Sequence, residues 1–253
     1  MHINSGIALA KAIAIMTLVS GCASTIDRGN FGPFQRSLNN TSHGYQVVTD
    51  PTGTANSEYV ERFEVRNGDC TGNEDWSDCD NDRERSELSE KNKTTTPGKE
   101  YWYRWDIYFP EDYVNIYPTK TALAQFHQKS GHVVWMFQNS DGGYHLDQQV
   151  TGSTERYYEL ISEEDLRGKW HQIEVHANWE KNDSGFLKVW VNGEQKVDYS
   201  GRTMTAKAVY FKYGIYRSYM SRYKSWNNTD TVPTQTVYYS NVARATDRQS
   251  LAN

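Results

Sequence analysis

The chain has 253 residues, of which 27 are Lys or Arg and 32 are Asp or Glu, so its net charge is −5 at neutral pH. Proteins that bind nucleic acid present a basic surface, and this acidic composition argues against that class. The length is sufficient for one large all-β domain behind an N-terminal export segment.

Residues 1–22 have the pattern of an export signal. The apolar run that follows Lys11 is too short to cross a bilayer and fits the hydrophobic region of a secretory signal. The run ends in Val-Ser-Gly-Cys, which resembles the bacterial lipobox, where the cysteine (here Cys22) is lipidated and becomes the mature N-terminus. Because Ala23 follows, and not the Asp typical of inner-membrane retention, we predict an outer-membrane lipoprotein, on the periplasmic or the cell-surface face. A plain signal peptide with an incidental cysteine is the alternative.

Residues 23–42 are rich in Ser, Asn and Gly and are predicted to form a linker from the lipid anchor. Residues 43–253 would then form the folded domain.

Cys70 and Cys79 are predicted to form a disulfide, since two cysteines so close in an exported protein typically close a short loop. The bond would brace the chain just before Arg85. The acidic side chains in and beside this loop could bind a structural Ca²⁺ through oxygen ligands: Asp75, Asp78, Asp80 and Asp82. Their spacing matches no EF-hand loop, so a solvated loop is the preferred interpretation, and no metal or other cofactor is required.

Alternating apolar residues predict β-strands along most of the domain. The Asn192-Gly193 pair between two such runs predicts a hairpin. Helix signals are confined to one possible turn at residues 162–166. The predicted strands cover residues 101–109, 132–138, 170–179, 186–191, 195–199 and 237–242. Many short strands separated by turns predict a β-jelly-roll sandwich of the concanavalin-like type, with a concave cleft.

Three further strand-like segments carry polar side chains on one face: residues 85–88, 125–127 and 210–216. Alternate side chains of a strand share a face, which groups the following residues: Arg85 with Glu87, Gln125 with His127, and Tyr210 with Lys212 and Tyr216. The apolar residues between them are predicted to face the core: Phe126, Phe211 and Ile215. Together the polar side chains suit an anionic sugar polymer from which a proton is removed next to a carboxylate.

These segments resemble the three motifs of the jelly-roll alginate lyases, which read Arg-(Ser/Thr)-Glu-(Leu/Val)-Arg, Gln-(Ile/Val)-His and Tyr-Phe-Lys-Ala-Gly-x-Tyr. Ser89 replaces the last Arg of the first motif, and Tyr213 replaces the Ala of the third. The wider context is similar to the glucuronan-lyase-like members of the jelly-roll polysaccharide lyase superfamily, at residues 168–171, 189–193 and 213–217. The resemblance covers about residues 45 to 245.

The resemblance implies β-elimination from a uronic acid, in which a base removes the C5 proton and an acid protonates the O4 leaving group. Arg85, whose planar fork can meet a carboxylate bidentately, and Gln125 would neutralise the substrate carboxylate. Tyr216 would be the acid, and also the base where the proton and the leaving group are syn. His127 would be the base or a further group that neutralises the carboxylate.

The remaining candidate site residues are predicted to bind substrate: Lys212, Glu87, Tyr210 and Arg217. Lys212 could lower the pKa of the Tyr216 phenol by its charge or hold a substrate carboxylate. A basic cleft on an acidic protein can attract a polyanion, and its candidate side chains are Arg83, Arg85, Lys212, Arg217, Arg222 and Lys224.

The predicted function is that of an endolytic polysaccharide lyase acting on a uronic-acid polymer of the glucuronan, ulvan or alginate type. The protein is expected to be a monomer whose partners are this polysaccharide and, through the lipid, a membrane. The alternative is a non-catalytic carbohydrate-binding lipoprotein of the same fold, because fold alone does not decide function. A glycoside hydrolase of this fold would instead need two carboxylates across the cleft.

Overall fold

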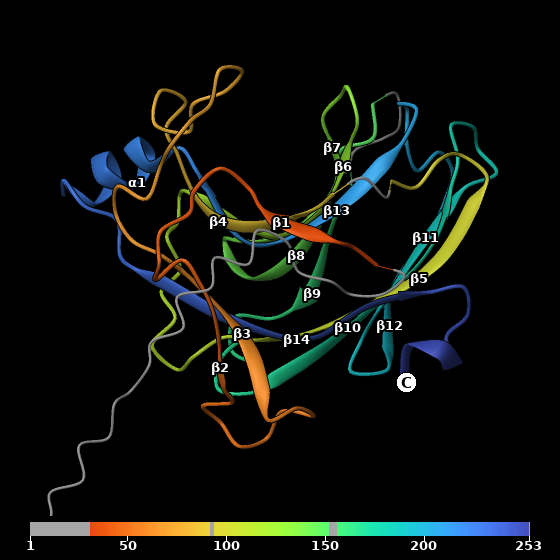
Figure 1. Ribbon diagram of the computed structural model, residues 1–253, viewed down its shortest axis with the longest axis horizontal. Helices are drawn as coiled ribbons and strands as arrows, with labels where there is room; N and C mark the ends of the chain where they lie inside the picture. Colours follow the sequence, from red (N-terminus) through yellow and green to blue (C-terminus); the bar gives the residue numbers. More distant parts are fainter. Residues whose placement is uncertain (1–30, 92–93, 152–155, 253) are drawn as a thin grey trace, which may run out of the picture.

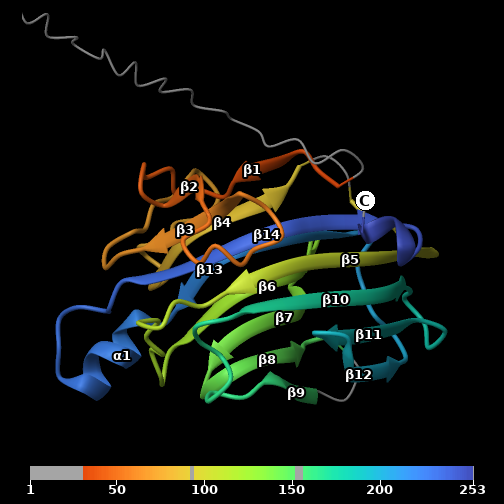
Figure 2. The ribbon, with the colours of Figure 1, turned by 90° about the horizontal axis from the view of Figure 1, so that it is seen from below.

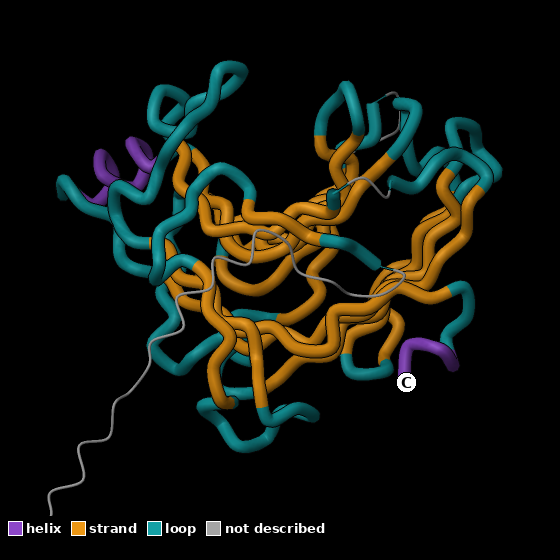
Figure 3. The backbone as a smooth tube through the Cα atoms, in the orientation of Figure 1, coloured by secondary structure: helices purple, strands orange, loops and turns teal. Residues whose placement is uncertain are grey.

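The structure is a computed structural model that describes residues 31–91, 94–151 and 156–252. Within these residues, two antiparallel sheets of seven strands each pack face to face (Figures 1 and 3). In the described residues, helical segments lie only at the periphery of the sandwich (Figure 3). The predicted jelly-roll sandwich is therefore confirmed.

The first sheet runs in the order β1 (Phe34–Arg36), β4 (Arg83–Glu90), β13 (Val209–Ser218), β6 (Lys120–Gln128), β7 (Val133–Ser140), β8 (Gly142–Gln148) and β9 (Arg156–Ile161). The second runs β12 (Glu194–Ser200), β11 (Phe186–Val191), β10 (Trp170–Trp179), β5 (Lys99–Tyr108), β14 (Gln235–Ala245), β3 (Tyr59–Val65) and β2 (Tyr45–Thr49). A helix, α1 (Met220–Asn227), follows β13 at one end of the sandwich (Figure 2), and a 3₁₀ turn, η1 (Gln249–Ala252), follows β14.

Aromatic side chains fill the space between the two sheets. The Trp105 ring of β5 lies 4.9 Å from the Phe137 ring of β7 and 5.3 Å from the Phe211 ring of β13. Phe126 and Ile215 are buried in the same cluster, as predicted. A shift of one residue in strand pairing would turn these rings to solvent, so the core also fixes which side chains face outward.

The hairpin between β11 and β12 forms where it is predicted. Asn192 and Gly193 have φ angles of 51° and 85°, the positive values that a two-residue turn of this kind requires. The bounds of β10 and β11 coincide with the predicted strands. Residues 162–166 form hydrogen-bonded turns rather than a helix.

The prediction of a linker over residues 23–42 does not hold in the part that the structure describes. The Phe31 ring packs 5.3 Å from the Phe211 ring, and Phe34 is completely buried on β1, which pairs with β4. Two aromatic residues are enough to anchor a segment whose composition is otherwise polar. The predicted signal peptide and the lipidation site at Cys22 lie outside the described residues.

Helix α1 has no clear sequence signal, because its N-cap residue, Tyr219, supplies no side-chain cap. A distant residue does so instead: the Asp82 carboxylate accepts hydrogen bonds from the backbone N–H of Ser221 at 3.1 Å. The Asp82 carbonyl also accepts the N–H of Tyr219 at 2.8 Å. Among the described residues, no helix is long and apolar enough to cross a membrane.

Gly214 of β13 lies where the two sheets approach closely. Its φ is 122°, and an added Cβ would lie 2.5 Å from the Ser86 carbonyl oxygen and 2.7 Å from the Phe63 ring. We predict that Gly214→Ala lowers the free energy of unfolding by about 3 kcal/mol, the combined effect of backbone strain and overpacking.

Thermal denaturation followed by circular dichroism would measure this loss. Gly53→Ala is the matched control, because Gly53 also has a positive φ, 67°, but has open space around it. Equal decreases in Tm for the two variants would contradict the prediction.

Candidate active site

A groove of about 750 Å³ runs over the outward face of the first sheet. The β6–β7 turn lies on one side of this face and α1 on the other (Figure 1). Four cationic side chains line the groove, namely Arg83, Arg85, Lys120 and Lys212. Among the described residues that line it, none is Asp or Glu. A protein with a net negative charge thus presents a cationic groove.

The structure brings together most of the residues that the sequence groups. Side chains of β4, β6 and β13 meet in the groove because β13 pairs with β4 on one edge and β6 on the other. The predicted site residues that line it are Arg85, Gln125, His127, Tyr210, Lys212 and Tyr216. Glu87 is buried in the ion pairs of this sheet and does not line the groove.

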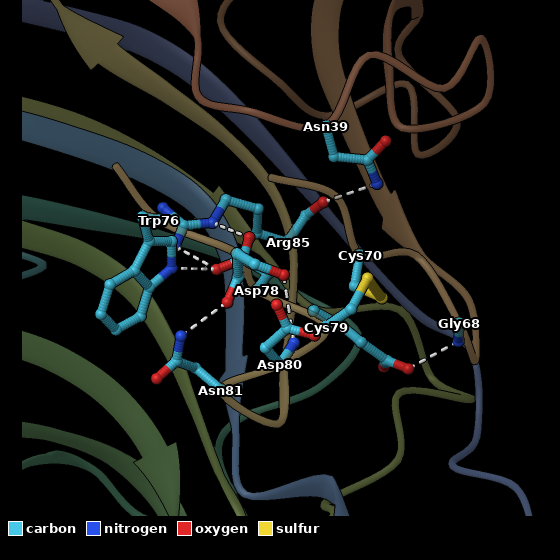
Figure 4. Close-up of a disulfide and its surroundings, with 11 residues drawn as sticks. Asn39, Gly68, Cys70, Trp76, Asp78, Cys79, Asp80, Asn81 and Arg85 are labelled. Atoms are coloured by element: carbon cyan, nitrogen blue, oxygen red, sulfur yellow. Dashed lines mark hydrogen bonds and ion pairs between the residues drawn. A yellow bond between two sulfur atoms is a disulfide. The ribbon is translucent and has the colours of Figure 1, made fainter. Parts of the chain in front are cut away.

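Arg85 does not present its fork to the groove. Its Nε and Nη2 donate to the two carboxylate oxygens of Asp78, each at 2.5 Å (Figure 4). Its Nη1 lies 3.3 Å from the Ser37 hydroxyl and 3.5 Å from Glu87. Asp78 therefore occupies the Nε–Nη2 edge of the guanidinium, and a substrate carboxylate cannot meet Arg85 bidentately at that edge.

The pairing of Asp78 with Arg85 is what the sequence does not reveal: it groups Asp78 only with possible Ca²⁺ ligands, although this residue immediately precedes a predicted disulfide cysteine. The Cys70–Cys79 disulfide is present, and Asp78 is completely buried beside it (Figure 4). The indole N–H of Trp76 donates to the same carboxylate at 2.8 Å. The disulfide loop thus places the buried carboxylate of Asp78 against the Arg85 guanidinium.

The acidic side chains around this loop have separate partners. Asp78 pairs with Arg85, whereas Asp82 caps α1 through Ser221. Within the described part of the chain, no group of three or more His, Cys, Asp or Glu residues is placed to hold a metal ion.

Glu87 contacts two of the residues that line the groove, Lys212 and Gln125. Its carboxylate forms an ion pair with the Lys212 ammonium and accepts a hydrogen bond of 2.5 Å from the Gln125 amide. Burial lowers the pKa of Lys212, and the charge of Glu87 opposes that shift. Arg85 and Lys212 are therefore each paired with a buried carboxylate, Asp78 and Glu87 respectively.

His127 is held in a tautomer suited to accept a proton. Its Nδ1 lies 2.9 Å from the carbonyl oxygen of Gln128. Because a carbonyl only accepts, Nδ1 carries the proton and the lone pair of the neutral ring is on Nε2. Burial lowers the pKa of His127 below 6.5; the hydrogen bond to Gln128 opposes this shift, and the charge of Lys212 adds to it. The imidazole is therefore neutral at neutral pH.

Tyr216 is held in the protonated state. Burial raises the pKa of its phenol above 10, while the charges of Arg85 and Arg83 oppose the rise. The Arg85 guanidinium lies over the Tyr216 ring, 4.3 Å from its centroid. The expectation that Lys212 lowers this pKa is not met, since the shift is upward and Lys212 pairs with Glu87.

The other two predicted substrate-binding residues differ in position. Tyr210 lines the groove with its ring 5.3 Å from that of His127, and burial raises its pKa to about 12. Arg217 is completely buried on the opposite face of β13, where it forms an ion pair with Glu84. The alternation of the strand turns Arg217 inward, so its predicted contact with substrate does not fit the structure.

The two departures from the alginate lyase motifs have different consequences. Tyr213 is buried in the core, where its hydroxyl donates to Glu61 at 2.9 Å, so it cannot touch a ligand in the groove. Ser89 pairs with Lys212 across β4 and β13, next to the floor of the groove. Only the change at Ser89 alters the surface near the site.

We predict that Asp78→Asn destabilises the protein by about 3–5 kcal/mol, because it leaves the buried guanidinium of Arg85 without its counter-charge. Thermal denaturation should show a large decrease in Tm. Asp80→Asn, an exposed change in the same sequence segment, serves as the control and should leave Tm nearly unchanged. A Tm for Asp78→Asn equal to that of the control would show that the pair is not needed.

Comparisons with known proteins agree with the fold. The polysaccharide lyase family matches residues 26–243. The structure of an endo-β-1,4-glucuronan lyase from the fungus Trichoderma reesei is 16% identical, with a TM-score of 0.57, and the match covers 84% of this chain and 96% of that one. Alginate lyase A1-II′, a member of polysaccharide lyase family 7, is 17% identical, with a TM-score of 0.54 and coverage of 85% and 96%.

The same alginate lyase with one histidine and one tyrosine replaced, in complex with substrate, is 16% identical, with a TM-score of 0.53 and coverage of 84% and 91%. No curated protein sequence matches the chain. At these identities the solved structures establish the shared fold, and the family match spans most of the sequence. The resemblance to the jelly-roll polysaccharide lyases is confirmed, and this chain belongs to the polysaccharide lyase family.

Proposed function

We propose that the protein is an endolytic lyase that cleaves a uronic-acid polysaccharide by β-elimination. One observation carries the proposal: a neutral imidazole and a protonated phenol face a single groove that is lined by cations and by no carboxylate of the described residues. A base and an acid with these protonation states are what the reaction needs. The lining also argues against a hydrolase, which would need two carboxylates in the groove.

In the proposed reaction, Nε2 of His127 accepts the C5 proton of the uronate. The electron pair of the C5–H bond forms the C4=C5 double bond, and the C4–O4 bond breaks. The Tyr216 hydroxyl gives its proton to O4 of the leaving sugar. The tautomer of His127 and the raised pKa of Tyr216 support this assignment of base and acid.

Negative charge grows on the substrate carboxylate as the proton leaves, and the groove floor offers donors for it. Lys212, the second N–H of the Gln125 amide, and Nη1 of Arg85 are the available groups. Fixed donors of this kind stabilise developing charge without reorganisation during the reaction. Arg85 contributes mainly by its charge, because Asp78 holds its fork.

We propose a polymer such as glucuronan as the substrate, with alginate and ulvan as further candidates. Two solved structures of this fold are named as a glucuronan lyase and an alginate lyase, which supports a uronate polymer. Ser89, in place of the last arginine of the alginate motif, argues against alginate as the preferred polymer. A second hollow adjoins the groove and shares two lining residues with it, which supports endolytic cleavage of a chain that lies across both.

A panel of glucuronan, alginate, ulvan and heparin-like chains, followed by ultraviolet absorbance, tests this function. Elimination conjugates a new double bond with the carboxylate, so only a lyase produces the signal.

We predict that Tyr216→Phe, which removes one hydroxyl and leaves the ring, lowers kcat by about 10²–10⁴-fold. Viscosity measured alongside should fall early if cleavage is endolytic. Binding without any rise in absorbance would instead indicate a non-catalytic carbohydrate-binding protein.

The pH dependence of kcat/KM follows from the two pKa shifts. Activity should rise as His127 loses its proton, with a midpoint below 6.5, since burial lowers its pKa. It should fall only when Tyr216 ionises, with a midpoint above 10, since burial raises its pKa. A broad plateau across neutral pH is therefore expected. An acidic midpoint above 6.5 would remove His127 from the role of base.

A further inference from the structure

We propose that the hollow beside the catalytic groove is a second subsite, in which Arg222 and Arg83 bind another carboxylate of the same polymer chain. This inference rests on the proposed function and names how the substrate is held away from the reacting sugar. The hollow measures about 390 Å³. Its lining residues that matter here are Pro118, Lys120, Asp141, Tyr157, Tyr219 and Arg222.

The hollow is continuous with the groove. Lys120 and Tyr219 line both, and Arg83 lines the groove next to Tyr219. A chain bound over Tyr216 can therefore extend past Tyr219 without leaving the cationic surface.

Both arginines contact the ring of Tyr219. The Cζ of Arg83 is 3.9 Å and that of Arg222 is 4.1 Å from its ring centroid. The residue has a φ of 65°, a conformation that bulky side chains rarely adopt. It is fixed by its N–H to the Asp82 carbonyl, at 2.8 Å, and by its carbonyl, which accepts from the Thr119 hydroxyl at 2.8 Å. The chain is thus locally strained and anchored so that both arginines meet on one ring.

The charges of these arginines differ from those of the groove floor. Arg85 and Lys212 are balanced by Asp78 and Glu87. Across the residues that the structure describes, neither Arg83 nor Arg222 forms an ion pair with a carboxylate.

Three carboxylates lie near this hollow. Asp141 lines it, Asp147 is 4.0 Å from the Lys120 ammonium, and Asp82 accepts hydrogen bonds from Ser221. None of the three forms an ion pair with Arg83 or Arg222. The two arginines are therefore the cations available to attract an anionic chain, and an arginine fork suits a carboxylate.

Exposed rings complete a surface suited to sugar. Tyr157 and Tyr219 are 50% and 40% exposed, and both line the hollow. The Tyr157 ring stacks on His145 at 4.7 Å, and its hydroxyl lies 2.5 Å from that of Ser140. Held in this way, the Tyr157 ring offers an apolar face to a sugar and a polar edge to its hydroxyls. Cations beside exposed aromatic faces are what a uronate residue requires.

Affinity electrophoresis in gels that contain glucuronan tests the subsite without depending on turnover. Tyr216→Phe is the parent protein, so that the polymer is not consumed. We expect Arg222→Gln to raise the apparent Kd about two- to fivefold, the effect of one partly solvated ion pair, and Arg83→Gln to act in the same direction. Lys224→Gln is the matched control: it removes one charge from the same helix, and Lys224 lines neither the groove nor the hollow.

The carboxyl-reduced polymer separates charge recognition from sugar recognition. The parent and Arg222→Gln should bind this neutral chain equally, and added salt should weaken parent binding to glucuronan more than it weakens binding by Arg222→Gln. The subsite is refuted if Arg222→Gln binds glucuronan as the Lys224→Gln control does, or if it loses affinity for acidic and reduced polymer alike.

Failure of the proposed function would look different. In that case the protein with Tyr216 intact gives no absorbance change on any uronate polymer, while Arg222→Gln still weakens binding of the acidic chain.

Discussion

The buried ion pair between Asp78 and Arg85 is the interaction on which the site depends. A guanidinium inside a sheet is costly unless a counter-charge and hydrogen bonds satisfy it, and both Asp78 oxygens do so at 2.5 Å. The Cys70–Cys79 disulfide fixes Cys79, the residue after Asp78, and the ion pair of Asp78 with Arg85 joins this loop to β4. With one edge engaged by Asp78, the Arg85 guanidinium lies over the Tyr216 ring and places a fixed positive charge against the phenol.

At the groove of the first sheet, the carboxylates are buried and the cations form the lining. Asp78 and Glu87 are buried against the sheet, whereas the cations face the groove, which no described Asp or Glu lines. This separation explains how a chain with a net charge of −5 can present a surface for a polyanion, because a cleft concentrates the field of its own lining. The cations that are paired with Asp78 and Glu87 suit the proposed catalysis at one sugar. Arg83 and Arg222, which form no ion pair with a carboxylate of the described residues, suit the proposed capture of the rest of the chain.

The same burial that stabilises the fold sets the protonation states at the site. Burial disfavours charge, which lowers the pKa of an imidazole and raises that of a phenol. His127 and Tyr216 are both partly buried between neighbouring strands, so each is shifted toward its neutral form. A neutral imidazole and a protonated phenol at the same pH follow from this one cause.

The sequence by itself determined which side chains share a face, because alternation along a strand is a local property: Gln125 with His127 and Lys212 with Tyr216 are examples. Tertiary structure decided what those faces meet. Strand pairing turned Arg217 toward Glu84, and the disulfide loop brought Asp78 to Arg85. Asp82, far away in the chain, caps helix α1, and the Tyr219 ring before this helix meets Arg83 of β4. These contacts join segments whose separation leaves no periodic signal, so only the folded chain reveals them.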